Sequence, residues 1–78
     1  GTMIEAKGYG FASLLQSSYL KTRLTYRWIG QATRQVLASG GREIEWYFAE
    51  ESAREYAEEI FGKIDALKRI RVIYRPME

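Results

Sequence analysis

The hydrophobic and polar positions in the first half of the chain predict a short strand followed by a long helix. Residues 4–7 are apolar-led and end at the glycine-bounded residues 8–10, which permit a sharp turn. From residue 11 to residue 39, apolar side chains recur at helical spacing and proline is absent. The stretch exceeds the usual helix length, so we expect a break near residues 16–18 or a bend at Gly30.

The second half predicts two more strands with a helix between them. Residues 40–41 are glycines that end the first helix, and residues 43–48 then alternate, with Ile44, Trp46 and Phe48 on one side. An acidic turn starts the next helix. Its apolar stripe consists of Ala53, Ala57, Ile60 and Ile64. Residues 69–74 alternate again before Pro76.

The order strand, helix, strand, helix, strand predicts an α/β layered fold with a small mixed or parallel sheet. A chain of 78 residues with 46% hydrophobic content suits one compact domain or a piece of one. Residues 1–3 resemble a vector remnant plus a start codon, so we take the domain as residues 4–78. Three strands alone leave edges and one face poorly covered, which suggests a missing upstream portion and leaves self-association open.

Composition excludes several classes of chemistry. The chain contains no cysteine and no histidine, which removes disulfides, thiol catalysis, thiolate zinc sites and imidazole bases. A metal ion must therefore be held by oxygen ligands. No apolar run approaches the roughly 20 residues of a membrane helix, and the start of the chain lacks the layout of a signal peptide. We expect a soluble domain that does not bind membranes.

Charge is strongly segregated along the chain, although the net charge is only +2. Residues 8–41 contain no acid and four basic side chains, which are Lys21, Arg23, Arg27 and Arg34. Residues 42–67 contain eight acids and three basic side chains, and the remainder is basic again. The first segment suits a polyanion, whereas the second suits a different kind of partner.

Glu5 and Lys7 form the pair with the clearest potential for chemistry. Side chains of a strand alternate, so these two point to the same face. In phosphodiester hydrolysis a carboxylate holds a divalent cation, and a lysine positions water and offsets charge at the phosphate. A Glu-x-Lys tripeptide is common, however, and by itself it favours a solvated ion pair.

The basic helix supports two interpretations. Arg23, Arg27 and Arg34 lie on one side of it with Gln31 nearby, a pattern typical of phosphate contacts or of a solvated face. Tyr19 and Tyr26 have the size and spacing of core residues, and we assign them to the core rather than to base stacking. The core set also includes Trp28, Trp46 and Phe48.

Four short segments carry a family resemblance that runs nearly the whole chain. They are IEAKGY at 4–9, QATRQ at 31–35, GREIEWYFAE at 41–50 and RVIY at 71–74. Together they resemble the restriction-endonuclease-fold toxins of bacterial polymorphic toxin systems. That family is similar to PD-(D/E)xK nucleases, and some members are type VI secretion effectors that degrade DNA in rival bacteria. The resemblance implies the β-α-β-α-β portion of a restriction-endonuclease-like fold.

The resemblance also implies roles for individual residues. Glu5 would be the metal-binding acid for Mg²⁺ or Mn²⁺, Lys7 the catalytic lysine, and Gln31 the helix glutamine that points back at the active site. The charge pattern, rather than the resemblance, predicts that Lys21, Arg23, Arg27 and Arg34 contact the nucleic acid. The family's first acid, an aspartate on the preceding strand, would lie upstream of Glu5. We therefore expect the carboxyl-terminal part of a nuclease domain, inactive alone.

The implied biology is that of a secreted toxin which cuts DNA in the cytoplasm of target cells and is neutralised by a cognate immunity protein. RNA is an open alternative because the phosphate chemistry is shared. A second alternative is a non-catalytic interaction module that binds the immunity protein or another copy of itself. We expect the acidic helix to face solvent, with docking of a basic immunity protein as the sharper alternative. Its acids are Glu51, Glu55, Glu58 and Glu59.

Overall fold

The computed structural model describes residues 1–76 as one sheet and a layer of helices. The elements in chain order are β1 (Met3–Lys7), α1 (Phe11–Leu14), α2 (Ser18–Ala38), β2 (Ile44–Phe48), α3 (Glu51–Gly62), the short 3-10 helix η1 (Asp65–Leu67) and β3 (Ile70–Tyr74). The sheet order is β1-β2-β3, and both strand pairs are parallel. The α/β prediction is confirmed, and the sheet is parallel rather than mixed.

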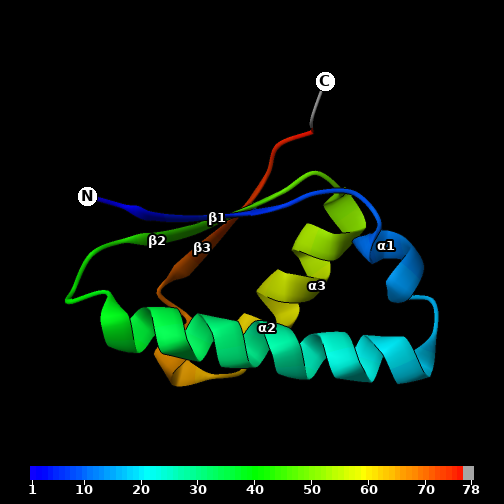
Figure 1. Cartoon of the computed structure of the whole chain (residues 1–78), viewed down its shortest axis with the longest axis horizontal. Helices are drawn as coiled ribbons and strands as arrows, with labels where there is room; N and C mark the ends of the chain where they lie inside the picture. Colours follow the sequence, from blue (N-terminus) through cyan, green and yellow to red (C-terminus); the bar gives the residue numbers. More distant parts are fainter. Residues whose placement is uncertain (77–78) are drawn as a thin grey trace.

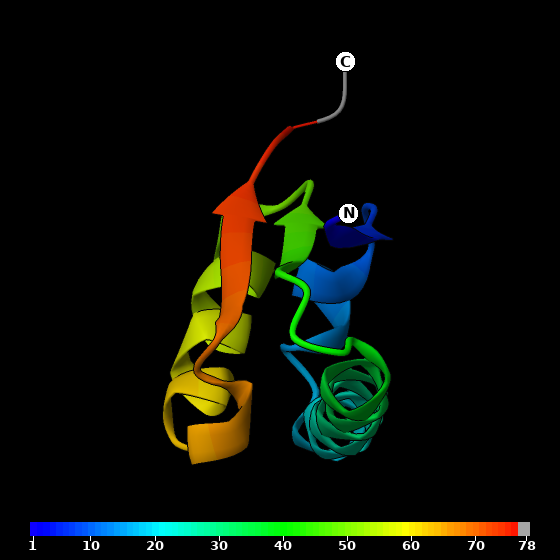
Figure 2. The same ribbon diagram turned by 90° about the vertical axis from the view of Figure 1, so that its left-hand side faces the viewer.

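Helices α2 and α3 lie on the same side of the sheet (Figures 1 and 2). Trp46 of the central strand joins them, because its ring centroid lies 6.3 Å from that of Trp28 on α2 and 5.1 Å from that of Phe61 on α3. Two right-handed crossovers that advance in one direction along a sheet place both helices on one face. The domain therefore has two layers.

The core lies between these layers. The stripe Leu24, Trp28 and Ala32 of α2 is buried, and so are Trp46 and Phe48 of β2, as predicted. Edge-to-face ring packing links Trp28 to Phe48, with centroids 5.3 Å apart. The aromatic cluster fixes the rotation of α2 about its own axis.

That rotation corrects the assignment of Tyr19 and Tyr26 to the core. Their side chains are 66% and 73% exposed. With Leu24 and Trp28 facing the sheet, positions 19 and 26 fall on the opposite side of the helix. The tyrosines are thus surface residues, and large size was a misleading guide to burial.

The long first helix is broken near residues 16–18, one of the two expected outcomes. A separate turn, α1, ends at Leu14, and α2 runs through Gly30 without interruption. Ser17 caps α2, because its side-chain Oγ accepts a hydrogen bond of 3.3 Å from the backbone N–H of Leu20. The cap satisfies one of the free N–H groups at the start of the helix.

Ser17→Ala is expected to lower the free energy of unfolding by about 1 kcal/mol, because alanine has no oxygen to accept that hydrogen bond. Urea unfolding followed by far-UV circular dichroism measures the change. Ser17→Asp, which restores an acceptor at the helix start, is the matched control and should retain wild-type stability. Equal losses in both variants would show that the cap contributes nothing.

Register places Glu5 and Lys7 on the helix side of the sheet. Glu5 aligns with Trp46 and Lys7 with Phe48, both of which face the helices. Met3, excluded from the predicted fold, is the first residue of β1, and its N–H donates to the carbonyl of Glu43 at 2.8 Å. Odd-numbered residues of β1 therefore point toward α2.

The opposite face of the sheet is uncovered in residues 1–76. Ile4 is 63% exposed there. Tyr47 donates a hydrogen bond of 2.7 Å to Glu45, which raises the pKa of its phenol, and the guanidinium of Arg75 lies 4.5 Å from its ring centroid. Ile4, Tyr47 and Arg75 border a hollow of about 560 Å³.

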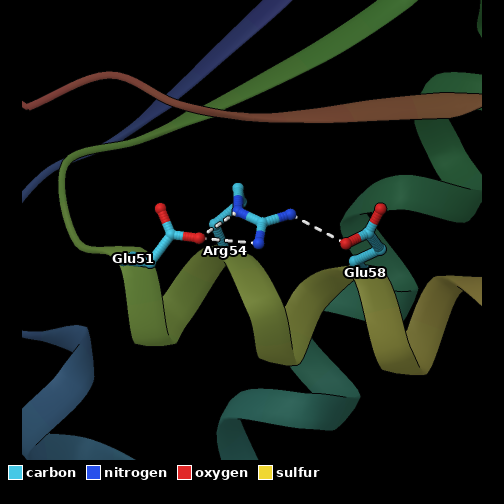
Figure 3. Close-up of polar contacts among 3 residues, drawn as sticks. All are labelled: Glu51, Arg54 and Glu58. Carbon is cyan, nitrogen blue, oxygen red and sulfur yellow. Dashed lines mark hydrogen bonds and ion pairs between the residues drawn. The ribbon is translucent and has the colours of Figure 1, made fainter.

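The outer side of α3 is acidic and exposed, as predicted for Glu51, Glu55, Glu58 and Glu59. Arg54 bridges Glu51 and Glu58 at 2.6 and 2.7 Å, one helical turn on either side (Figure 3). These hydrogen bonds raise the pKa of Arg54 further. Exposed pairs of this spacing contribute little to stability.

None of the helices in residues 1–76 has both the length and the apolar character needed to cross a bilayer.

Candidate active site

Glu5 and Lys7 lie side by side near the carboxyl end of β1, on the face that packs against α2. The carbonyl of Lys7 accepts a hydrogen bond of 3.0 Å from the N–H of Ala49, which continues the ladder to the end of the strand. Lys7 is the last residue of β1, so the pair lies near the carboxyl end of the sheet. The order β1-β2-β3 contains no reversal of strand order of the kind at which ligand sites form in open parallel sheets, so the candidate site rests on its side chains rather than on the topology.

The ammonium group of Lys7 is held by two acceptors. Its Nζ donates to Gln31 Oε1 at 2.7 Å and lies 3.1 Å from Glu5 Oε2. An ammonium has three N–H donors, so one donor remains for a phosphate oxygen or a water. The structure thus brings together Glu5, Lys7 and Gln31, the three residues assigned to catalysis.

Aromatic rings surround the same ammonium group. Lys7 Nζ lies 5.0 Å from the ring centroid of Trp46 and 5.9 Å from that of Phe11. The lysine side chain is 13% exposed, and the Glu5 side chain is 24% exposed. This environment strengthens the electrostatic effect of Lys7, because few water molecules screen it.

Gln35 connects the site to the core, a role that was not predicted. Its Oε1 accepts a hydrogen bond of 2.7 Å from the indole N–H of Trp46, and its Nε2 approaches Glu5 Oε1 at 3.5 Å. Gln35 follows Gln31 by four residues and so shares its helix face. The four-residue spacing of Gln31 and Gln35 within the segment QATRQ could have predicted that Gln35 also lies near the site.

The segment between β1 and α2 is shaped by Gly10, whose φ of 105° favours glycine. The α1 turn that follows is fixed from a distance, because Glu50 Oε1 accepts a hydrogen bond of 3.0 Å from the N–H of Ala12. Phe11 then packs on Trp28, with ring centroids 5.6 Å apart. These contacts place the Phe11 ring beside the Lys7 ammonium.

A cleft of about 330 Å³ opens beside Lys7. Its basic and amide side chains come from Lys7, Arg27, Gln31 and Arg34, and Tyr26 and Trp28 also line it. Arg27 and Arg34 are exposed, two turns apart on one side of α2. The cleft therefore combines one fixed lysine with two arginines suited to phosphate oxygens.

Trp28 adds a buried polar atom beside this cleft. Its side chain is almost fully buried, and within residues 1–76 its indole N–H has no hydrogen-bond partner. Buried donors are usually paired, so an unpaired one is a sign of strain or of a missing partner.

The other two predicted basic residues lie outside the cleft. Lys21 Nζ lies 4.7 Å from the ring centroid of Tyr56, on a different side of α2. Arg23 stacks near Tyr19, with its guanidinium carbon 5.8 Å from the ring centroid. Only Arg27 and Arg34 of the four thus line the cleft that contains Lys7.

Oxygen ligands for a metal ion are few. Across residues 1–76 no three acidic side chains come close enough to share an ion. Glu5 supplies one carboxylate to the network, and one carboxylate is less than a protein magnesium site ordinarily uses together with substrate phosphates and water. The described residues therefore do not form a complete site for Mg²⁺ or Mn²⁺.

Comparison with known proteins gave no relative: no protein-family model, no curated protein and no solved structure matches this chain.

Proposed function

We propose that this chain carries the Glu-x-Lys part of a metal-dependent nuclease that hydrolyses phosphodiesters of DNA. The observation that carries the proposal is the inward-facing pair of Glu5 and Lys7, with Lys7 bonded to Gln31 beside a basic cleft. A solvated surface ion pair would be exposed to water, whereas the Lys7 and Glu5 side chains are only 13% and 24% exposed and point between the sheet and α2.

The side chains suggest a division of labour around one phosphate. Arg27 and Arg34 each bind the oxygens of one flanking phosphate, to which a planar guanidinium group can donate two hydrogen bonds. Lys7, fixed by Glu5 and Gln31, donates its remaining N–H to the oxygen on which negative charge grows. Gln31 thereby acts as a positioning residue for the lysine.

The proposal requires a second acid. Because Glu5 is the only carboxylate that we place in the network of residues 1–76, the metal requires at least one more acidic oxygen. We place this acid upstream of Glu5, where the toxin nucleases that the chain resembles carry an aspartate. The antibacterial role, the secretion route and the cognate immunity protein are part of the same proposal.

Cleavage of supercoiled plasmid with Mg²⁺ or Mn²⁺ tests the proposal. The 78-residue chain is compared with a longer form extended upstream to include the expected aspartate, with EDTA as the control. We expect the longer form to cut and the shorter one not to cut. If neither form cuts DNA or RNA under any of these conditions, the nuclease assignment of Glu5 and Lys7 is wrong.

Arg27→Ala and Arg34→Ala are each expected to reduce by about 1 the slope of log binding constant against log salt concentration for DNA. The reason is that each arginine neutralises one phosphate in the cleft. Fluorescence anisotropy at several salt concentrations measures the slope. Arg54→Ala, on the acidic helix, is the matched control and should leave the slope unchanged.

A second candidate function is favoured by the uncovered sheet face. The hollow beside Ile4 and Tyr47 presents apolar surface without a partner in residues 1–76, which suits an interaction module that pairs with a second copy of the chain. Light scattering after size-exclusion chromatography distinguishes the two functions. A stable dimer with no affinity for DNA would favour the second, and a monomer that binds DNA would favour the first.

A further inference from the structure

The outward side of α2 combines exposed tyrosines with arginines. Tyr19, Arg23, Tyr26, Arg27 and Arg34 recur at intervals of four, three, one and seven, which places them along one side of the helix. We call this set the tyrosine-arginine stripe. All five side chains are exposed, and residues 8–41 contain no acid to oppose them.

Tyr26 is the best placed of these side chains for contact with a ligand. Its side chain is 73% exposed. It borders the cleft that contains Lys7 and also a second hollow of about 360 Å³. A bound strand that ran from the cleft toward the start of α2 would pass over the Tyr26 ring, because Tyr26 lines both hollows.

Tyr19 lies about 10 Å further along the helix, since seven residues separate it from Tyr26 at about 1.5 Å each. Arg23 lies between them, and its Nη1 donates to the Tyr19 hydroxyl at 3.2 Å. The rings are too far apart to hold one base between them. Each ring is therefore available to a different base of one strand.

We infer that the tyrosine-arginine stripe binds an unpaired nucleic-acid strand, with bases stacked on Tyr26 and Tyr19 and phosphates bound by the arginines. The inference rests on the proposed function and specifies its substrate as single-stranded at the cleft. Every base has a face that can stack on an aromatic ring, whereas bases inside a duplex are stacked on one another. Duplex DNA would offer the stripe its phosphates alone.

Alanine is a poor probe here because it removes packing area as well as stacking, so leucine replaces each tyrosine. Tyr19→Leu and Tyr26→Leu are each expected to weaken binding of a 15-nucleotide oligothymidylate about tenfold. Binding of an abasic oligonucleotide of the same length should not change in Tyr26→Leu, whereas Tyr19→Leu also removes the hydroxyl that holds Arg23. Tyr26→Trp should retain wild-type binding, since an indole ring also stacks on bases. Tyr74→Leu, an exposed tyrosine on β3, is the matched control.

Fluorescence anisotropy in EDTA gives the result without any cleavage, using the 78-residue chain. Equal affinity of the wild-type protein for oligothymidylate and abasic strand would overturn the inference, as would unchanged binding in both leucine variants. Equal competition by polyglutamate would overturn it in favour of an acidic protein partner. If stacking is found but the longer form never cuts DNA or RNA, the stripe stands and the nuclease proposal fails.

Discussion

Lys7→Met is expected to reduce the rate of DNA cleavage about 100-fold or more while the protein stays folded, which is the scale of losing one fixed donor to a growing negative charge. Methionine has a similar length and can fill the space between the rings of Phe11 and Trp46. It provides neither charge nor N–H donors. The measurement is plasmid cleavage by the longer form of the protein.

The stability of the same variant separates a reactive role from a structural one. Lys7→Met leaves the Glu5 carboxylate, whose side chain is 24% exposed, without its counter-ion, and the loss of one partner of a partly buried ion pair is destabilising. The free energy of unfolding should therefore fall. A 100-fold loss of cleavage in protein that circular dichroism shows to be folded would then report a reactive role. Cleavage at the wild-type rate would exclude Lys7 from the reaction.

Trp46→Ala is expected to lower the free energy of unfolding by about 3–5 kcal/mol. The indole is fully buried on the central strand and packs against Trp28 of α2 and Phe61 of α3, so its loss leaves a cavity between both helices and the sheet. Small domains have little stability in reserve. Most molecules should be unfolded at 25 °C, as urea titration with far-UV circular dichroism would show.

One further variant separates the hydrogen bond of Trp46 from its packing, and a second serves as a control at an exposed position. Trp46→Phe keeps a ring in the core but removes the N–H that donates to Gln35, so we expect a loss of about 1–3 kcal/mol. Leu37→Ala, at a position that is 81% exposed on α2, should change stability by less than about 0.5 kcal/mol. Similar losses in all three variants would contradict the central position of Trp46.

Strand and helix positions were predictable from the sequence because segments with two-residue alternation of apolar side chains are followed by segments with helical spacing. The alternation of Ile44, Trp46 and Phe48 directly predicted which side of β2 is buried. Strand order was not predictable, because the same periodicity fits several orders of three parallel strands. The single helical layer depends on that order, so it appeared only in the structure.

The candidate site was predictable in part. The pairing of Glu5 with Lys7 follows from two-residue alternation, but the direction in which the pair points does not, and it is the inward direction that brings Gln31 within 2.7 Å. Gln35 required knowledge of which helix face meets β1. Tyr26 was wrongly assigned to the core because its size suggested burial, whereas the buried stripe of α2 consists of Leu24, Trp28 and Ala32.

The parallel sheet also has a consequence for the order in which the protein acquires its properties as it folds. The contact of Lys7 with Gln31 spans 24 positions of the chain, and that of Glu5 with Gln35 spans 30. Both contacts therefore form only after the first crossover has closed. The tyrosine-arginine stripe belongs to a single helix and needs no such closure. A chain still folding can therefore present its basic helix to a polyanion before the contacts that hold Lys7 have formed.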